Sequence, residues 1–423
     1  MISNTLQPKP RYPSLPIIKY HHNKHLIKTM NNSQSLSQAN LPQDETLLQP
    51  ITEKQVRYFQ ERLLEWFERE GRHDLPWKPQ EQFSEKINLY RIWISEIMLQ
   101  QTQVVTVIPY FERFMAAFPT PEDLAAASEE AVLKLWQGLG YYSRARNLHA
   151  ASKQLVAEFN GVIPPNFEAI RSLKGIGDTT ANAILAQGFN LPFAILDGNV
   201  RRVLSRITGM TAPRKELDKR LKTISETFLC SQNPADYTQA IMDFGATLCK
   251  LKPQCDRCFL QSHCAAFIHD KVADIPAKPI KKKNPTESIA LILYWSDRNQ
   301  ILLEKRPAKG IWGNLYSLPE LLLKGKDHKS ASSPIIGIQS LADFPQREPL
   351  TNIRHQFTHY TLEASLFKVP ISDQAIQNLL KSQSNPEDFR LVTVEEALLL
   401  PKPQPIAELL TKISTHSLTQ TLW

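Results

Sequence analysis

The stretch RSLKGIGDTTANAILAQGF, residues 171–189, places a short glycine turn between two segments with apolar residues at helical spacing. Gly175 and Gly177 let the backbone turn tightly, and Ile176 between them can fill the space between two packed helices. The turn amides and the start of the second helix would then face outward, as a site for a phosphate oxygen. A glycine pair alone does not distinguish such a site from an ordinary helix–turn–helix packing unit.

Helical periodicity extends on both sides of this unit. It begins at ITEKQVRYFQERLLEWFERE, where Thr52 and Gln55 have capping-box spacing, and it continues to about residue 268. We therefore expect an all-α domain over residues 51–270. KVADIPAKPIKKKNP, residues 271–285, reads as a linker rich in proline and lysine.

The pattern changes after the linker. SIALILYW and QILLEKRP are β-rich runs that flank residues 297–299, which predicts a hairpin, and a helical stretch follows near VEEALLL. These features predict a second domain of the α+β class over residues 286–412.

The chain has 423 residues and a formal net charge of +8. A basic balance suits a polyanionic partner, although a solvated basic surface is as common. No stretch approaches the roughly 20 continuous apolar residues of a membrane helix, so we expect no membrane association. Residues 1–50, with several prolines and no acid before Asp44, are expected to be a disordered extension. They resemble either a transit peptide or a segment upstream of a start at Met30.

Four of the five cysteines follow the pattern Cys249-x5-Cys255-x2-Cys258-x5-Cys264. This clustering argues against a disulfide framework and for a metal or cluster site in a reducing compartment. The spacing leaves Zn²⁺ and a [4Fe–4S] cluster open, although zinc sites usually bring two short cysteine pairs. Four buried thiols without a ligand are the remaining alternative. Cys230 stands apart and is expected in the core.

Two carboxylates occupy unusual sequence positions. Glu96, in SEIMLQQTQV (residues 95–104), has apolar neighbours, which is costly unless the carboxylate is paired or takes part in chemistry. Asp197, in AILDGNVRRVLSRITGM (residues 194–210), directly precedes a predicted helix, so it is either simply an N-cap or a functional acid. Asn199 could equally cap that helix.

WQGLGYYSRARNL, residues 136–148, joins two tyrosines to two arginines. Aromatic rings beside arginines suit base stacking and phosphate contact, but the same combination is common on ordinary surfaces.

Taken together, these motifs resemble the adenine DNA glycosylases of the MutY type, which are helix–hairpin–helix enzymes with an iron–sulfur cluster. The resemblance rests on LPW (75–77), SEIMLQQTQV, GLGYYSRARNL, LKGIG, LDGNVRRVL, MDFGATLC and the cysteine run, and it covers roughly residues 53–268 before continuing into the second domain. It implies a helix–hairpin–helix glycosylase domain with a [4Fe–4S] cluster held by Cys249, Cys255, Cys258 and Cys264, followed by a Nudix-like domain.

The resemblance also implies a function. The enzyme would hydrolyse the N-glycosidic bond of adenine paired with 8-oxoguanine or guanine in double-stranded DNA, as a monomer in the bacterial cytoplasm at the nucleoid. Glu96 would be the general acid that protonates adenine at N7, with a pKa raised by its apolar neighbours. Asp197 would stay ionised through its capping bonds and stabilise an oxocarbenium-like sugar.

Further residues are implied to contact DNA. Gln101 matches a residue that wedges into the duplex, Tyr141 an aromatic that stacks beside 8-oxoguanine, and Asn199 a residue near the reacting sugar. Thr179 occupies the position at which endonuclease III relatives carry a lysine that forms a Schiff base, so we expect a monofunctional enzyme. The remaining expected contacts are Gly175 and Gly177 in the hairpin, together with Gln100, Gln103, Arg144 and Arg146.

The sequence also departs from the family's pattern. The first cysteine gap is five residues where six is usual, and Lys174 stands where proline is usual. In the second domain, LLEKRPAKGIWGNLYSLPEL (302–321) is Nudix-like, but LLLKGKDHKSASS follows in place of the glutamate-dense helix that holds Mg²⁺. We therefore expect this domain to bind rather than hydrolyse.

RHQFTHYTL, residues 354–362, resembles the family's loop near 8-oxoguanine, with Phe357, Thr358 and His359 as candidate contacts. Guanine has a bare N7 acceptor, whereas 8-oxoguanine has an N7–H donor from which a hydroxyl such as Thr358 can accept.

Three alternative functions were weighed. An endonuclease III-like lyase and a thymine-mismatch glycosylase are the enzyme alternatives, and Thr179 with the Nudix-like domain argues against the lyase. A non-catalytic iron–sulfur protein that binds DNA is the third, and the presence of both Glu96 and Asp197 argues against it.

Overall fold

The structure is a computed structural model that describes residues 51–277, 284–324, 348–381, 383 and 385–415. The predicted N-terminal extension lies outside the described residues, as do the middle of the linker and most of the segment that replaces the glutamate-dense Nudix helix. In the described part of the chain, no helix is both long enough and apolar enough to cross a membrane.

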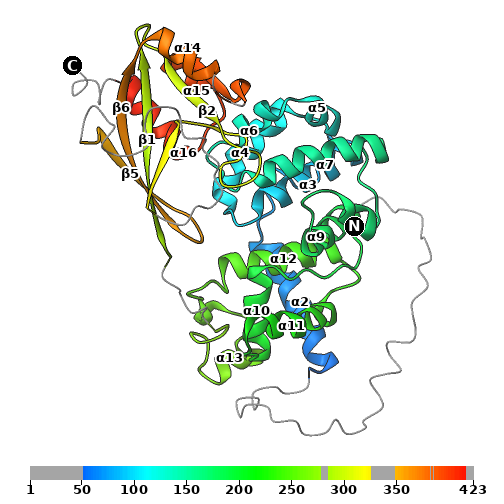
Figure 1. Ribbon diagram of the computed structural model, residues 1–423. Coiled ribbons are helices and arrows are strands. Elements are labelled where there is room, and N and C mark those ends of the chain that lie inside the picture. Colours follow the sequence, from blue (N-terminus) through cyan, green and yellow to red (C-terminus); the bar gives the residue numbers. More distant parts are fainter. Residues whose placement is uncertain (1–50, 278–283, 325–347, 382, 384, 416–423) are drawn as a thin grey trace, which may run out of the picture. The chain divides into compact units, whose positions relative to one another are not determined.

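The first described range is helical, as predicted (Figure 1). Its helices are α2 (Glu53–Glu70), α3 (Glu85–Leu99), α4 (Val104–Ala117), α5 (Pro121–Ala126), α6 (Glu129–Trp136), α7 (Ser143–Phe159), α8 (Phe167–Ser172), α9 (Asp178–Phe189), α10 (Gly198–Thr208), α11 (Arg214–Phe228), α12 (Pro234–Thr247), η2 (Cys255–Arg257), η3 (Gln261–His263) and α13 (Ala265–Ile268).

Local capping fixes several of these helix starts. The expected capping box at Thr52 is present, since its hydroxyl accepts from Gln55 N and the Gln55 side chain accepts from Thr52 N. Ser84 caps α3 through a bond from Ile87 N, and Asp197 caps α10 through a bond from Val200 N. Each cap satisfies an amide that would otherwise lack a partner at the helix start.

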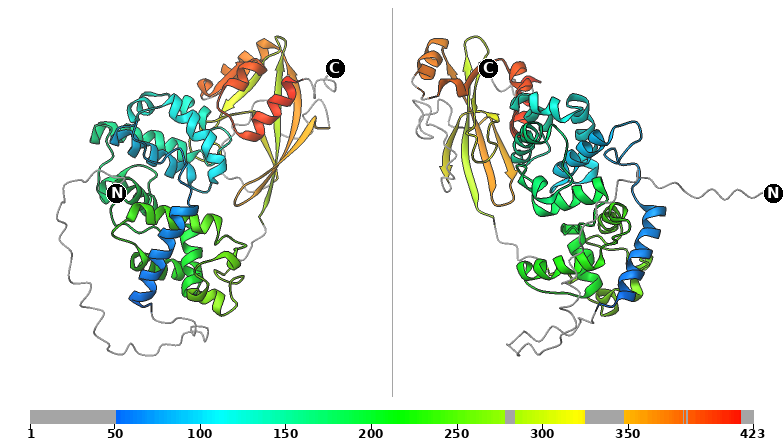
Figure 2. Two further views of the ribbon diagram at one scale, coloured as in Figure 1. Left: turned by 180° about the vertical axis from the view of Figure 1, so that it is seen from behind. Right: turned by 90° about the vertical axis from the view of Figure 1, so that its right-hand side faces the viewer.

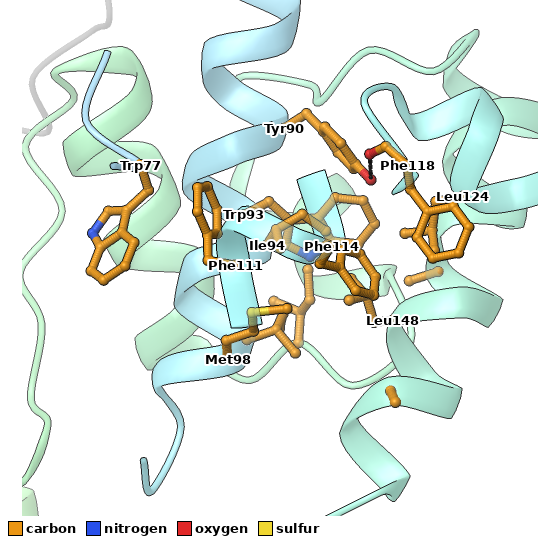
Figure 3. Packing of buried hydrophobic residues seen from close by; sticks show 14 of the residues in the cluster. Trp77, Tyr90, Trp93, Ile94, Met98, Phe111, Phe114, Phe118, Leu124 and Leu148 are labelled. Carbon is orange, nitrogen blue, oxygen red and sulfur yellow. Dashed lines mark hydrogen bonds between the residues drawn. The ribbon is translucent and has the colours of Figure 1, made fainter. Parts of the chain in front are cut away.

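The helices enclose two separate hydrophobic clusters. The first runs through α3 to α9, and Figure 3 shows its aromatic centre, where Trp93, Phe111 and Phe114 pack around Met98 and Tyr90 donates to the Phe118 carbonyl at 3.0 Å. The second joins α2 to α10, α11 and α12 and contains the predicted core residue Cys230. Helices α3 and α10 therefore belong to different clusters.

The described residues after the linker form a seven-stranded sheet with helices on both faces. Its strands are β1 (Thr286–Ser296), β2 (Ile301–Lys305), β3 (Tyr316–Ser317), β4 (Glu320–Lys324), β5 (Thr351–Gln356), β6 (Thr361–Ile371) and β7 (Phe389–Val392). The path β3-β2-β1-β6-β5 also pairs β4 with β1 and β7 with β2. Only the β1–β6 pair is parallel among these described strands. The predicted hairpin is confirmed by the antiparallel pairing of Trp295 with Ile301.

Alternation along β1 determines which helices cover each face of the sheet. Ile289, Leu291 and Leu293 point to the face covered by α15 (Val394–Leu399) and α16 (Gln404–Ser414). Ala290 and Ile292 point to the opposite face, with α14 (Asp373–Lys381). Figure 2 shows α14 in orange and α16 in red on opposite sides of the sheet. The 3-10 turn η5 (Pro386–Asp388) leads into β7.

Candidate active site

Glu96 lies in the C-terminal half of α3, where most of the neighbouring residues are buried. Its neighbours on α3 include the fully buried Ile94 and Met98, and the side chain of Glu96 itself is only partly exposed. Burial is the largest influence on its carboxyl and raises the pKa from 4.5 to about 7. A hydrogen bond from Gln187 Nε2 to Glu96 Oε1, 2.7 Å long, opposes this rise, and the negative charge of Asp197 adds to it.

Asp197 forms the N-cap of α10. Its Oδ1 accepts from Val200 N at 2.7 Å, and its Oδ2 accepts from Asn199 Nδ2 at 3.2 Å. Burial nevertheless raises the pKa of Asp197, because it outweighs these bonds and the nearby charges of Arg202 and Arg201. Capping alone would lower the pKa of Asp197, but burial has the larger effect.

The two carboxylates interact electrostatically although they come from different parts of the helical fold. Glu96 belongs to the helix at the centre of the first cluster, and Asp197 precedes a helix of the second. The negative charge of Asp197 adds to the effect of burial, so the Glu96 carboxyl holds its proton to a higher pH than burial alone would give. This arrangement can supply an acid and a negative charge to the same substrate.

Asn199 links Asp197 to the cysteine loop. Arg202 Nη2 donates to Asn199 Oδ1 at 2.9 Å, and Arg202 Nε donates to the Cys249 carbonyl at 2.9 Å. Close packing of α10 on α12 permits this link, because a Cβ on Gly245 would lie only 2.7 Å from Asn199 Cβ.

The four clustered cysteines line one cavity with apolar neighbours such as Phe244 and Leu248. Burial, with some repulsion among the thiols, raises the pKa of Cys258 to about 12 and of Cys264 to about 11, so thiolates at these positions need a positive centre. A lone zinc needs four sulfurs about 2.3 Å from the ion. No group of three or more ligands in the described residues is close enough to hold a single metal ion. Four thiols that line one cavity are a donor set that both zinc sites and iron–sulfur clusters use.

The predicted hairpin is formed by α8, a turn and α9. Gly175 has φ +83°, and a Cβ there would lie 2.7 Å from Asn147 Cβ, so glycine is required on both counts. Ile176 is buried between the helices, as expected. Gly177 and Thr179 are exposed at the start of α9, which has no side-chain cap bond. Asp178 also lies in this first turn.

Gln101 and Tyr141 lie in two turns held by one buried guanidinium. Both residues are exposed and have positive φ, 59° and 49°. The prediction that Arg144 contacts DNA is wrong, because its side chain is buried among backbone acceptors. Its guanidinium donates to the carbonyls of Ile97, Met98, Gln100, Leu139 and Gly140 and to Thr102 Oγ1.

The other expected DNA contacts beside these turns also have partners in the protein. Arg146 Nη1 donates to the Gly313 carbonyl at 2.7 Å, and Gln100 Nε2 donates to Thr180 Oγ1 at 3.2 Å. Gln103 precedes α4 as its N-cap residue.

The loop between β5 and β6 carries the remaining candidates. Thr358 and His359 are exposed, and Phe357 is held by rings on three sides, with centroids 4.6 Å from Tyr360, 4.6 Å from His355 and 5.3 Å from Trp312. Thr358 Oγ1 lies 3.1 Å from Tyr141 Oη in a hydrogen bond. Tyr141 and Thr358, each predicted from its own motif to contact 8-oxoguanine, are thus in contact although they are 217 positions apart in the sequence.

Several contacts of this site were missed at the sequence level. Gln187 is 91 positions from Glu96, and nothing in its own sequence context marks it as a partner. Leu315, from the sheet domain, is fully buried in the first helical cluster, while Glu130 on α6 accepts from Tyr316 Oη at 3.0 Å and from Arg390 Nη2 at 3.1 Å. Glu130 and Gln187 look like ordinary helix surface residues until the packing is known.

Comparison with known proteins agrees with this arrangement. Residues 94–226 match the family model of the HhH-GPD superfamily of base excision DNA repair proteins, and residues 290–412 match the NUDIX domain model. The fold and site thus define a helix–hairpin–helix DNA repair protein with an added Nudix-like domain.

Individual relatives narrow this class. The adenine DNA glycosylase of Buchnera aphidicola subsp. Baizongia pistaciae (strain Bp) is 35% identical over 362 residues, which are 85% of this chain and 98% of that protein. The Homo sapiens adenine DNA glycosylase is 40% identical over 376 residues, covering 76% of this chain and 68% of that protein. The chain therefore belongs to the adenine DNA glycosylase family. Among solved structures, a thermostable thymine-DNA glycosylase aligns with TM-score 0.45 and 24% identity over 51% of this chain and 98% of that one.

Proposed function

We propose that this protein removes adenine from double-stranded DNA in which adenine stands opposite 8-oxoguanine or guanine. The observation that carries the proposal is the partly buried Glu96 carboxyl, whose pKa burial and the charge of Asp197 raise to about 7. Membership of the adenine DNA glycosylase family supports the choice of base. Residues 51–270 form the catalytic domain in this proposal, and residues 286–412 recognise the opposite base.

Adenine must leave the base stack before chemistry begins, at a cost of a few kcal/mol. Protonated Glu96 then donates its proton to adenine N7. The bond between the sugar C1′ and adenine N9 breaks, and its electron pair leaves with the base. The cationic sugar is stabilised by the Asp197 carboxylate. Water then adds at C1′ and gives up a proton to the Glu96 carboxylate, which leaves an abasic site and restores the acid. Since Glu96 titrates near neutrality, it is available as an acid at working pH.

Gln101 and Tyr141 support a role in opening the duplex. Both are exposed on turns that Arg144 holds rigidly, so their positive φ values are maintained by the protein before DNA arrives. Gln101 would fill the space left by adenine, while Tyr141 would stack beside the opposite base. The exposed start of α9, with Gly175, Gly177 and Thr179, would bind a backbone phosphate.

The opposite base would be read by the pair formed by Tyr141 and Thr358. The Thr358 hydroxyl can accept from N7–H of 8-oxoguanine, whereas guanine presents a lone pair at that position. Phe357 holds this loop through its ring contacts with Trp312 and Tyr360. His359, which is exposed beside Thr358, is a further candidate contact to the opposite base.

The cysteine loop would hold a [4Fe–4S] cluster through Cys249, Cys255, Cys258 and Cys264. When bound, the cluster would supply the positive centre that thiolates at the buried Cys264 and the half-buried Cys258 require. Arg202 then holds Asn199 near the reacting sugar through its own bonds to the loop. We further propose that the protein acts as a monomer on chromosomal DNA in the bacterial cytoplasm, as its similarity to bacterial relatives suggests.

An oligonucleotide duplex with adenine opposite 8-oxoguanine tests the proposal. We expect strand cleavage only after alkali, because Thr179 offers no amine for a Schiff base with the sugar. A matched duplex with thymine opposite adenine is the control. Strand cleavage without alkali, or trapping of the protein on DNA by borohydride, would instead favour the lyase alternative.

A further inference from the structure

We propose that Gln187 is a positioning residue for the general acid, because its amide occupies one carboxyl oxygen of Glu96 and leaves the other oxygen to carry the proton. This inference rests on the proposed function, in which Glu96 is the proton donor. Gln187 itself does not touch the reacting atoms and acts only through Glu96.

The geometry specifies which oxygen is free. Gln187 Nε2 donates to Glu96 Oε1 at 2.7 Å, a short bond for an amide and a carboxyl group. An oxygen that accepts an N–H bond is the carbonyl oxygen of a neutral carboxylic acid, because the O–H oxygen accepts poorly. The proton of neutral Glu96 therefore resides on Oε2, and its direction is fixed before substrate binds.

A close helix crossing brings Gln187 to this position. The next residue on α9 is Gly188, where a Cβ would lie 2.6 Å from Leu89 Cδ2 and 3.8 Å from Ile92 Cδ1. Leu89, Ile92 and Glu96 are spaced by three and four residues along α3 and so share one face of that helix. Because Gly188 has no side chain, α9 can approach this face of α3 closely. The Gln187 side chain then reaches the Glu96 carboxyl at the C-terminal end of the same face.

The groups around Glu96 determine how much the Gln187 bond matters for the pKa of this carboxyl. Asp197, ahead of α10, raises its pKa, and burial raises it more. From α7, the Arg144 guanidinium is directed at the backbone carbonyls of Ile97 and Met98. The helix α4, also packed on α3, contributes buried apolar residues. The Gln187 amide is thus the hydrogen-bond donor that opposes burial at this carboxyl.

Loss of the Gln187 amide should shift the pH dependence of adenine release, which a purely structural role of Gln187 would leave unchanged. Without the bond, the pKa of Glu96 rises further, so the carboxyl holds its proton to higher pH and its direction is no longer fixed. The pH at which adenine release falls to half its maximum should therefore increase, while affinity for DNA stays the same.

The test is single-turnover adenine release from pH 5.5 to 9 by the full-length, cluster-containing protein. Gln187→Met keeps the side-chain length and removes the donor. We expect its half-maximal pH to rise by roughly one unit, as for loss of a hydrogen bond to a charged group. Gln154→Met is the matched control, since Gln154 Nε2 donates to Glu158 Oε2 at 3.1 Å on an exposed surface. The pH profile of adenine release by Gln154→Met should equal that of the parent.

The outcomes separate this inference from the function on which it rests. An unchanged half-maximal pH in Gln187→Met, with the parent active, overturns the role of Gln187 alone. An inactive parent overturns the proposed function. If Gln187→Met folds poorly by circular dichroism, Gln187→Asn replaces it, because the shorter amide cannot span the same distance and should give the same upward shift. A downward shift in either variant also rejects the inference.

Discussion

The raised pKa of Glu96 predicts that Glu96→Gln stabilises the protein at high pH. The folded state binds the Glu96 proton more tightly than the unfolded state, because burial raises its pKa from 4.5 to about 7. The contribution of this proton to the free energy of unfolding is therefore fully present below pH 4.5. This contribution is lost as the pH rises through 7. Glutamine does not titrate, so the free energy of unfolding of Glu96→Gln increases relative to that of the parent between pH 4.5 and pH 7.

The size of the effect follows from the same pKa. At about 1.4 kcal/mol for each pH unit, a pKa raised from 4.5 to about 7 corresponds to about 3 kcal/mol once the group is fully ionised. For a domain of 150–250 residues, this equals an increase of roughly 6–12 °C in the midpoint of thermal unfolding. At pH 5 the gain should be only about 1 kcal/mol, because this pH lies just above the unfolded pKa of 4.5 and well below the folded pKa.

The assay is thermal unfolding of the cluster-containing protein under anaerobic conditions, followed by circular dichroism at pH 5 and pH 8.5. Glu112→Gln, an exposed change on the neighbouring helix α4, is the control for the loss of one negative charge. A gain by Glu96→Gln that is equal at both pH values, or no gain at pH 8.5, would refute the reasoning.

Three further predictions concern other parts of the site. Arg144→Lys should lower the unfolding free energy by about 3 kcal/mol, since one ammonium cannot serve six buried or partly buried acceptors and about three would be left unpaired. The exposed change Arg113→Lys is the control, and an equal unfolding midpoint in the two variants would reject the role of Arg144. Cys258→Ser should lose the brown chromophore and affinity for DNA, whereas Cys230→Ser should keep both; chromophore retained in Cys258→Ser removes it from the ligand set. Thr358→Ala should narrow the preference for 8-oxoguanine over guanine opposite adenine, as measured by the ratio of single-turnover rates; an equal loss on both substrates argues against direct reading by this hydroxyl.

Features that depend on neighbouring residues in sequence were predicted correctly. The capping box at Thr52, the burial of Ile176 in the hairpin turn and the hairpin around residues 297–299 all follow from short-range spacing. The four thiols also meet in one cavity, because the loop that joins them is short. In each case the determining contacts lie within about sixteen residues of one another.

Features that depend on packing between distant segments were not predicted. Arg144 has the sequence context of a surface arginine beside tyrosines, yet its guanidinium is buried beneath both turns. The direction of the Asp197 pKa depends on burial, which the N-cap pattern does not reveal. The parallel pairing of β1 with β6 joins segments about 75 residues apart, and no local turn signal announces it.

In the proposed reaction, Glu96 delivers the proton that releases adenine while Asp197 stabilises the sugar. The most direct measurement is chromatographic detection of free adenine from a duplex with adenine opposite 8-oxoguanine, under single-turnover conditions and with DNA affinity measured in parallel. We expect the parent and Glu112→Gln to release adenine, whereas Glu96→Gln should bind the duplex with parental affinity and release none. Adenine release by Glu96→Gln at the parental rate would show that Glu96 is not the proton donor.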